Sequence, residues 1–116
     1  MTVEAGRIVL VDWRDALPKE PNKMRPAIVI EDSELFDPAY PNVIVVPLAD
    51  DANLVISDLS LRIPPSPDNG CAKTCFALAQ HVTTASKRRV TPTASFITPA
   101  ELADIRRRVG LAIGLA

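Results

Sequence analysis

Arg25 is the residue whose setting in the sequence is best suited to chemistry. It stands directly before Pro26 and a run of β-favouring apolar residues that ends at Ile30. Pro26 lacks the N–H group that a sheet ladder needs, so it belongs at the start of a strand and places Arg25 at the strand mouth, beside a loop. A guanidinium held there is a rigid fork of donors with permanent charge, which suits a phosphate or a carboxylate. From the residues alone, a solvated arginine that merely flanks a strand is the alternative.

Few other side chains offer acid–base or metal chemistry. His81 is the only histidine; an imidazole could act as a general acid or base, although a structural histidine near a strand end is the commoner case. Cys71 and Cys75 are the only thiols. On one strand they would lie roughly 13 Å apart, too far for a disulfide, and a structural zinc needs about four ligands. We therefore predict no metal site, no cofactor, and two buried, reduced core cysteines.

The composition fits one folded domain over residues 1–116. The hydrophobic share is 47% and the charged share 23%, which excludes wholesale disorder. Thirteen Lys and Arg against fourteen Asp and Glu give a net charge of -1, which excludes the global basic field of a duplex-DNA binder, so any nucleic-acid site must be local. The sequence shows no signal-like start, and no apolar run approaches the ~20 residues that span a bilayer, so we expect a cytoplasmic protein.

Short apolar runs predict a mainly antiparallel sheet. The runs at 25–30 and 43–48 lack polar alternation, which is typical of strands buried on both faces. A short helical turn is expected around 33–36, and the Asn69-Gly70 pair is a turn signal before a later strand. The predicted strands cover residues 7–13, 25–30, 43–48, 54–63, 71–82 and 90–93. Together these elements favour a mainly β, α+β fold with a small barrel-like sheet.

One C-terminal helix closes the chain. Thr98, Pro99 and Glu101 form a capping box with proline at the first helical position. The apolar stripe of this helix is predicted to contain Leu102, Ile105, Val109, Ala112 and Ile113. The three arginines at 106–108 fall mostly outside the stripe, and we expect them on a solvated face where they complement the helix dipole.

In this order of elements the chain resembles the MazF/PemK family of toxins from bacterial type II toxin–antitoxin pairs. The resemblance runs almost end to end. It rests on Gly6 to Trp13 as "G-x-I-x-x-V-D-W", on Glu20 five residues before the arginine–proline strand, on Val43 to Leu48 as "V-I-V-V-P-L", and on Gln80 and Lys87 to Arg89 before the last helix. It implies an SH3-like β-barrel with added helices, a homodimer, metal-independent cleavage of single-stranded RNA, and neutralisation by a cognate antitoxin.

The resemblance also assigns roles to residues. Arg25 matches the catalytic arginine, which would stabilise the charge of the phosphorane formed when the RNA 2′-hydroxyl attacks the adjacent phosphorus and leaves a 2′,3′-cyclic phosphate. Glu20 matches the loop glutamate and could orient Arg25 or contact a base edge; a solvated carboxylate is the alternative. The candidate RNA-binding residues are Lys19, Lys23, Gln80, His81, Thr83, Lys87 and Arg88.

At one catalytic position the sequence departs from the family pattern. Similar proteins place threonine or serine after the Pro-Leu of the third strand, where its hydroxyl group binds the scissile phosphate, whereas this chain has Ala49. Losing one such donor typically costs on the order of 10²- to 10³-fold in rate. A natural loss of activity, an engineered substitution, or replacement by the hydroxyl group of Thr74, Thr83 or Thr84 would each explain the alanine. We expect RNA binding and the dimer to persist while cleavage is weak.

Two further classes of function compete with an endoribonuclease. The first is a non-catalytic toxin that traps a protein target, as the CcdB toxins of similar fold trap DNA gyrase. That action relies on an exposed C-terminal Trp-Gly-Ile, whereas this chain ends Ile113-Gly114-Leu115-Ala116, so we rank it lower. The second is an interaction module in which Arg25 has no chemical role. Cleavage of single-stranded RNA in the presence of a chelator separates the endoribonuclease from both.

Overall fold

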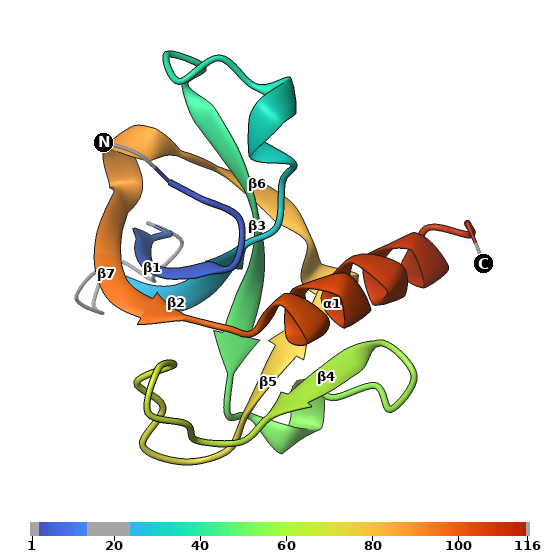
Figure 1. Ribbon diagram of the computed structural model, residues 1–116. Coiled ribbons are helices and arrows are strands. Elements are labelled where there is room, and N and C mark those ends of the chain that lie inside the picture. Colours follow the sequence, from blue (N-terminus) through green and yellow to red (C-terminus); the bar gives the residue numbers. More distant parts are fainter. Residues whose placement is uncertain (1–2, 14–23, 116) are drawn as a thin grey trace, which may run out of the picture.

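The computed structural model describes residues 3–13 and 24–115, and in these ranges the chain forms a β-sheet and one C-terminal α-helix (Figure 1). The strands are β1 (Arg7–Asp12), β2 (Met24–Val29), β3 (Asn42–Ala49), β4 (Ser60–Ile63), β5 (Cys75–Leu78), β6 (Thr83–Ser86) and β7 (Val90–Phe96), and the helix is α1 (Pro99–Ala112). Four short 3-10 helices connect them: η1 (Ser33–Leu35), η2 (Ala52–Leu54), η3 (Ala79–His81) and η4 (Lys87–Arg89). The predicted mainly β, α+β class is confirmed.

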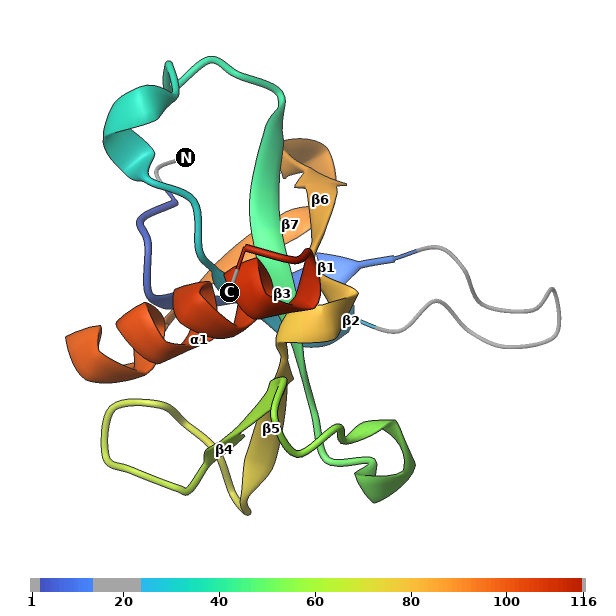
Figure 2. The same cartoon turned by 90° about the vertical axis from the view of Figure 1, so that its right-hand side faces the viewer.

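The sheet is antiparallel and is organised around β3. The strand order is β4-β5-β3-β2-β1-β7, and β6 pairs with β3 outside this path. The first half of β3 pairs with β6 and its middle with β2, while Leu48 and Ala49 at its end pair with β5. The sheet curls strongly in both views but its strand pairings do not close into a ring, so the barrel-like prediction holds for the curvature and not for closure (Figures 1 and 2).

The strands β2 and β3 are buried on both faces, as the absence of polar alternation at 25–30 and 43–48 predicts. Ala27 and Val29 of β2 pack into one core cluster with residues of β1, β3 and the β6–β7 segment, whereas Ile28 packs into a second cluster that α1 covers through Ile105. Successive residues of one strand thus serve two cores, because neighbouring side chains point to opposite faces. This double burial holds the mouth of β2, and with it Arg25, in a fixed place.

The helix begins at the predicted capping box. The Thr98 hydroxyl accepts from the Glu101 N–H, and the Glu101 carboxylate accepts from the Thr98 N–H. Ile105 is fully buried and packs with the partly buried Leu102 and Val109, so these members of the predicted stripe are confirmed. The stripe prediction is wrong for Ala112 and Ile113, which are exposed because the helix extends beyond the sheet there.

Two of the three helix arginines hold the helix on the sheet. Arg106 donates from Nε to the Ile30 carbonyl at 2.8 Å and from Nη2 to the Glu31 carbonyl at 3.0 Å. Arg108 donates to the carbonyls of Ser57 and Ser60. Arg106 and Arg107 are exposed, as predicted, whereas Arg108 is partly buried. The prediction missed that Arg106 and Arg108 also satisfy backbone carbonyls of the segments against which α1 packs.

Two predicted strands are shorter than expected. Of the segment 54–63, only Ser60–Ile63 is a strand: the Asp51 side chain accepts from the Asn53 N–H and begins η2, and the Ser60 hydroxyl then accepts from the Ile56 N–H in a tight turn. Of the segment 71–82, only Cys75–Leu78 is a strand, and the chain then enters η3. In the segment 54–63, polar side chains that bond nearby backbone groups delay the start of the strand, an effect that apolar periodicity does not show.

The cysteine prediction is confirmed in one part and wrong in another. Both thiols are free, but both are partly exposed rather than buried. Cys71 lies in the loop after the Asn69-Gly70 turn, outside β5, so the 13 Å separation expected on one strand does not apply. Burial, and then the neighbouring Cys75 through its charge and a hydrogen bond, raise the pKa of the Cys71 thiol to about 11. The structure thus places the two thiols beside each other.

Candidate active site

Arg25 and Ala49 are brought together by the pairing of β2 with β3. Ala27 lies opposite Pro47 in this antiparallel ladder, so that continuing the register by two residues sets Arg25 opposite Ala49. On its other side Arg25 pairs with Val11 of β1. Its side chain is exposed, and within the described residues it makes no hydrogen bond or ion pair. The guanidinium is therefore available to a ligand, as the sequence predicts.

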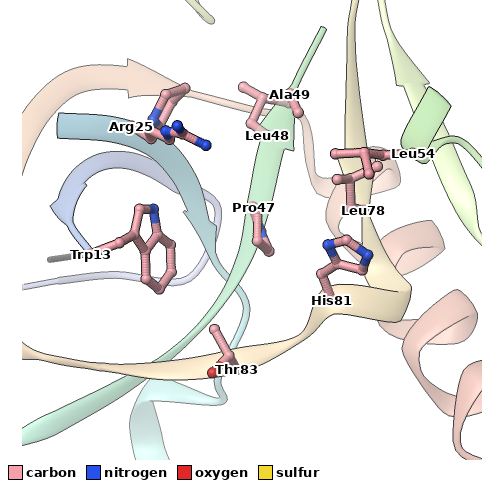
Figure 3. A pocket seen from close by; sticks show the side chains of 10 residues that line it. Trp13, Arg25, Pro47, Leu48, Ala49, Leu54, Leu78, His81 and Thr83 are labelled. Atoms are coloured by element: carbon pink, nitrogen blue, oxygen red, sulfur yellow. The ribbon is translucent and has the colours of Figure 1, made fainter. Parts of the chain in front are cut away.

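Two cavities adjoin this pair of residues. The first, of about 320 Å³, is lined by Trp13, Arg25, Pro26, Pro47, Leu48, Ala49, Leu54, Leu78, His81 and Thr83 (Figure 3). The second, of about 400 Å³, is lined by Arg25, Pro26, Leu48, Ala49, Asp50, Asp51, Leu54 and Cys75. Arg25 and Ala49 line both cavities and so stand at their shared border. A chain-like ligand could place one unit in each cavity with its linking group against the guanidinium.

Two polar side chains share the first cavity with Arg25. His81 enters it from η3, and Thr83 from β6, whose pairing with Val45 of β3 fixes its place (Figure 3). Of the three threonines considered as replacements for the missing hydroxyl group, Thr83 alone lines this cavity; Thr84, the next residue on β6, is not among the lining residues, and neither is Thr74. Because side chains alternate along a strand, Thr83 and Thr84 point to opposite faces.

Gln80 lies next to the cavity, but both ends of its amide are engaged within the chain. Its Nε2 donates to the Leu54 carbonyl at 2.9 Å, and its Oε1 accepts from the Ser60 hydroxyl at 3.1 Å. These bonds tie η2, which supplies Leu54 to the cavity wall, to η3, which supplies His81. Gln80 therefore joins two parts of the cavity wall, a role that the sequence alone did not indicate.

The basic cluster before the last helix lies elsewhere. Ser86, immediately before Lys87 and Arg88, pairs with Asn42 at the opposite end of β3 from Ala49, a separation of roughly 23 Å at the usual rise per residue. The Lys87 ammonium donates to the Pro38 carbonyl at 3.1 Å, whereas Arg88 is exposed. The structure therefore does not bring these two predicted RNA contacts to the Arg25 cavity of the same chain.

Three further predicted residues, Lys19, Glu20 and Lys23, lie outside the described residues. Their predicted roles rest on the sequence alone. Because residues 14–23 join β1 to β2, all three precede Arg25 in the connection that leads into the strand mouth.

An exposed ion pair neutralises Asp50, one of the two carboxylates that line the second cavity. Asp50 follows Ala49 and accepts from the Lys73 ammonium at 2.6 Å. This hydrogen bond and the opposite charge hold the pKa of Asp50 below its ordinary value and raise that of Lys73 above its own. Lys73 thus offsets a carboxylate that would otherwise repel an anionic ligand. No pattern in the sequence indicates this pairing, which joins segments more than twenty residues apart.

Within the described residues, no group of three or more His, Cys, Asp or Glu side chains is arranged to hold a metal ion. Over the same ranges, no helix combines the length and the apolar character needed to cross a membrane.

The sequence matches, over residues 4–113, the family described as PemK-like, MazF-like toxin of type II toxin–antitoxin system. An open, strongly curled antiparallel sheet with one C-terminal helix agrees with that class. The chain belongs to this family of toxins. No curated protein sequence matches it significantly.

Solved structures of similar fold support the assignment. One, titled an endoribonuclease in complex with its cognate antitoxin from a mycobacterial species, has a TM-score of 0.74 at 16% identity, over 99% of this chain and 98% of that one. MazF from Deinococcus radiodurans has a TM-score of 0.71 at 21% identity, over 98% of each chain. A MazE–MazF structure from the same organism has a TM-score of 0.73 at 19% identity, again over 98% of each chain.

Proposed function

We propose that this chain is an endoribonuclease toxin that cleaves single-stranded RNA at the Arg25 site. The observation that carries the proposal is the exposed Arg25 guanidinium, unpaired within the described residues, at the border of two cavities. Family membership and the solved structures of similar fold, which include an endoribonuclease, agree with this chemistry. Two cavities on either side of a fixed cation suit two nucleotides with the phosphate between them.

The proposed reaction uses a nucleophile that RNA itself provides. The 2′-hydroxyl oxygen attacks the adjacent phosphorus, the bond from phosphorus to the 5′-oxygen breaks, and a 2′,3′-cyclic phosphate and a 5′-hydroxyl group result. No metal ion is needed to generate the nucleophile. Arg25 would stabilise the charge that builds up on the nonbridging oxygens of the phosphorane, as preorganised donors do in oxyanion holes. Glu20, in the connection before β2, would orient Arg25 or contact a base edge.

Ala49 has no hydroxyl group to assist Arg25, and Thr83 is the best replacement that the cavity offers. Thr83 lines the same cavity as Arg25, and its Oγ1 makes only a long bond of 3.5 Å to the Thr84 carbonyl. A bond of that length is weak, so this hydroxyl could turn to a phosphate oxygen. We expect cleavage that is measurable but slow.

The RNA strand would extend beyond the two cavities. Trp13 lines the first cavity with its partly buried ring and would provide a platform on which one base stacks. Lys19 and Lys23 would contact phosphates next to the cleaved one. Lys87 and Arg88, at the far end of β3, would contact only a distant part of the strand.

Two protein partners are proposed. Solved structures of similar fold include an endoribonuclease in complex with its cognate antitoxin and a MazE–MazF pair. An acidic antitoxin segment lying over the Arg25 site of this chain would compete with RNA. A homodimer would cover exposed apolar side chains of this chain, among them Met24 and Ile56, which are 44% and 49% exposed. The expected location of such a pair is the cytoplasm.

Cleavage of a labelled single-stranded RNA of mixed sequence, in the presence of a chelator, tests the proposal. The expected products carry a 2′,3′-cyclic phosphate, and Arg25→Ala should lower the rate at least about 100-fold. Arg62→Ala is the matched control, since Arg62 is an exposed arginine on β4 and lines neither cavity. Equal rates for the wild type and Arg25→Ala would refute the assignment, and inhibition of DNA gyrase without RNA cleavage would favour a CcdB-like toxin instead.

A further inference from the structure

The first of the two cavities beside Arg25, of about 320 Å³, is lined by one side chain that can exchange a proton near neutral pH. Its lining residues are apolar except for Arg25, His81, Thr83 and the Trp13 indole. A guanidinium remains charged throughout the physiological range, and neither a threonine hydroxyl nor an indole titrates there. Attack by the RNA 2′-hydroxyl requires a group that accepts its proton. Among the described residues that line this cavity, the imidazole of His81 meets that requirement.

His81 does not have the environment of a structural histidine. It is exposed, and within the described residues its ring makes no hydrogen bond or ion pair. A histidine that stabilises a fold is usually buried or has a bonding partner for its ring nitrogens. In Figure 3 the ring lies beside Pro47 and Leu78, on the side of the cavity opposite Trp13. Both ring nitrogens are therefore available to a ligand.

The backbone that carries His81 is firmly held, which suits a residue that must meet a reacting atom. Ala79, two residues before it, is fully buried. Gln80 is fixed at both ends of its amide by Leu54 and Ser60. The Val82 N–H donates to the Ala79 carbonyl at 3.2 Å and closes the turn. The exposed imidazole thus stands on a rigid turn, at the edge of the cavity that holds Arg25.

The charged groups around η3 belong to several elements. Arg25 of β2 lines the same cavity, and Asp50 and Asp51 after β3 line the adjoining one. On α1, which packs against η3, Arg108 and Asp104 are bonded to each other. On β4, which also contacts η3, Arg62 is exposed. Within the described residues, none of these groups forms a hydrogen bond or an ion pair with the imidazole, which leaves both ring nitrogens open to the RNA.

We propose that His81 is the general base of the RNA cleavage reaction, an inference that rests on the proposed function. The neutral imidazole accepts the proton of the 2′-hydroxyl group while the bond from the 2′-oxygen to phosphorus forms. The bond from phosphorus to the 5′-oxygen breaks, and that oxygen takes a proton from water. The imidazolium then returns its proton to the hydroxide that remains. The net change is one proton moved from the 2′-oxygen to the 5′-oxygen.

Single-turnover cleavage between pH 5 and pH 9 tests this role. For the wild type, the rate should rise with pH and level off once the imidazole is neutral. His81→Gln should lose about 10²- to 10⁴-fold in rate and lose that rise. His81→Ala should regain activity on addition of free imidazole, which a structural role would not produce. Thr91→Ala, a change of an exposed residue on β7, is the control with unchanged rate.

Binding and folding are measured on the same variants. Affinity for an RNA with 2′-deoxy sugars, which cannot be cleaved, should stay within about threefold for His81→Gln, and the melting temperature should stay unchanged. If His81→Gln keeps the wild-type rate and pH profile, the role of His81 as general base is refuted. The proposed endoribonuclease function would then still stand, because cleavage itself would persist. Absence of cleavage in the wild type would overturn the proposed function together with it, so the two failures are distinguishable.

Discussion

Under the proposed function, replacing Ala49 with threonine should raise the rate of RNA cleavage. The antiparallel register places residue 49 opposite Arg25, and its side chain lines both cavities. A hydroxyl group there would donate to the same phosphate that Arg25 contacts. The exchange adds two heavy atoms to a half-buried position at a strand end, and β-branched residues suit a strand. The fold should therefore tolerate the substitution.

The size of the gain follows from the chemistry of one added donor. A donor aimed at charge that develops in the transition state is typically worth on the order of 10²- to 10³-fold in rate. Thr83 lines the same cavity and would already supply part of this stabilisation, so we expect the lower end, about 10²-fold. The gain should appear in kcat more than in KM, since the bond strengthens as the phosphorane forms.

The assay compares Ala49→Thr with Ala49→Val, which has nearly the same shape and no hydroxyl group. Single-turnover cleavage of one RNA oligonucleotide is measured for both variants and for each combined with Thr83→Val. The Thr83 change should slow the wild type more than it slows Ala49→Thr, because the two hydroxyl groups would serve the same phosphate and their effects would not add. Equal rates for the Thr and Val variants would refute the reasoning.

Three further predictions concern the parts that hold the site in place. Ile105→Ala should lower the free energy of unfolding by about 2–5 kcal/mol in a denaturant titration, because Ile105 is fully buried beneath the sheet, and an unchanged midpoint would contradict this. Burial alone would raise the pKa of Asp104, but hydrogen bonds from two helix arginines outweigh it and hold that pKa below the ordinary 3.8. The carboxylate therefore stabilises the fold above pH 3.8 and loses this effect as the pH falls through the lowered value. Asp104→Asn should lower the free energy of unfolding at pH 7 by about 0.5 kcal/mol, which a lower melting temperature would show. An equal loss of stability well below pH 3, where the carboxyl group is protonated, would contradict a stabilising effect of these ion pairs. Gln80→Leu should slow cleavage by releasing η2 from η3, with a smaller effect on overall stability, and Gln80→Glu should retain the bond from the Ser60 hydroxyl and only part of the rate.

Much of the fold could be predicted from residue order. The double burial of β2 and β3 follows from apolar runs without polar alternation, and the capping box marks the start of α1. The predictions failed where polar side chains bond to nearby backbone. Asp51 and Ser60 convert the expected strand start into η2 and a tight turn, and Arg106 donates from α1 to the backbone carbonyl of Ile30. Such bonds depend on which carbonyl or amide is left unsatisfied in the folded chain.

The candidate site divides in the same way. The sequence by itself determined that Arg25 stands at a strand mouth and that position 49 lacks a hydroxyl group, because a proline fixes the first and a residue type fixes the second. Only the tertiary structure decided which residues accompany them. Pairing of β3 with β6 and the turn of η3 bring Thr83 and His81 to Arg25, while the same pairing sends Lys87 to the far end of β3. Register and curl of a sheet place residues that are distant in sequence, and no local pattern encodes that placement.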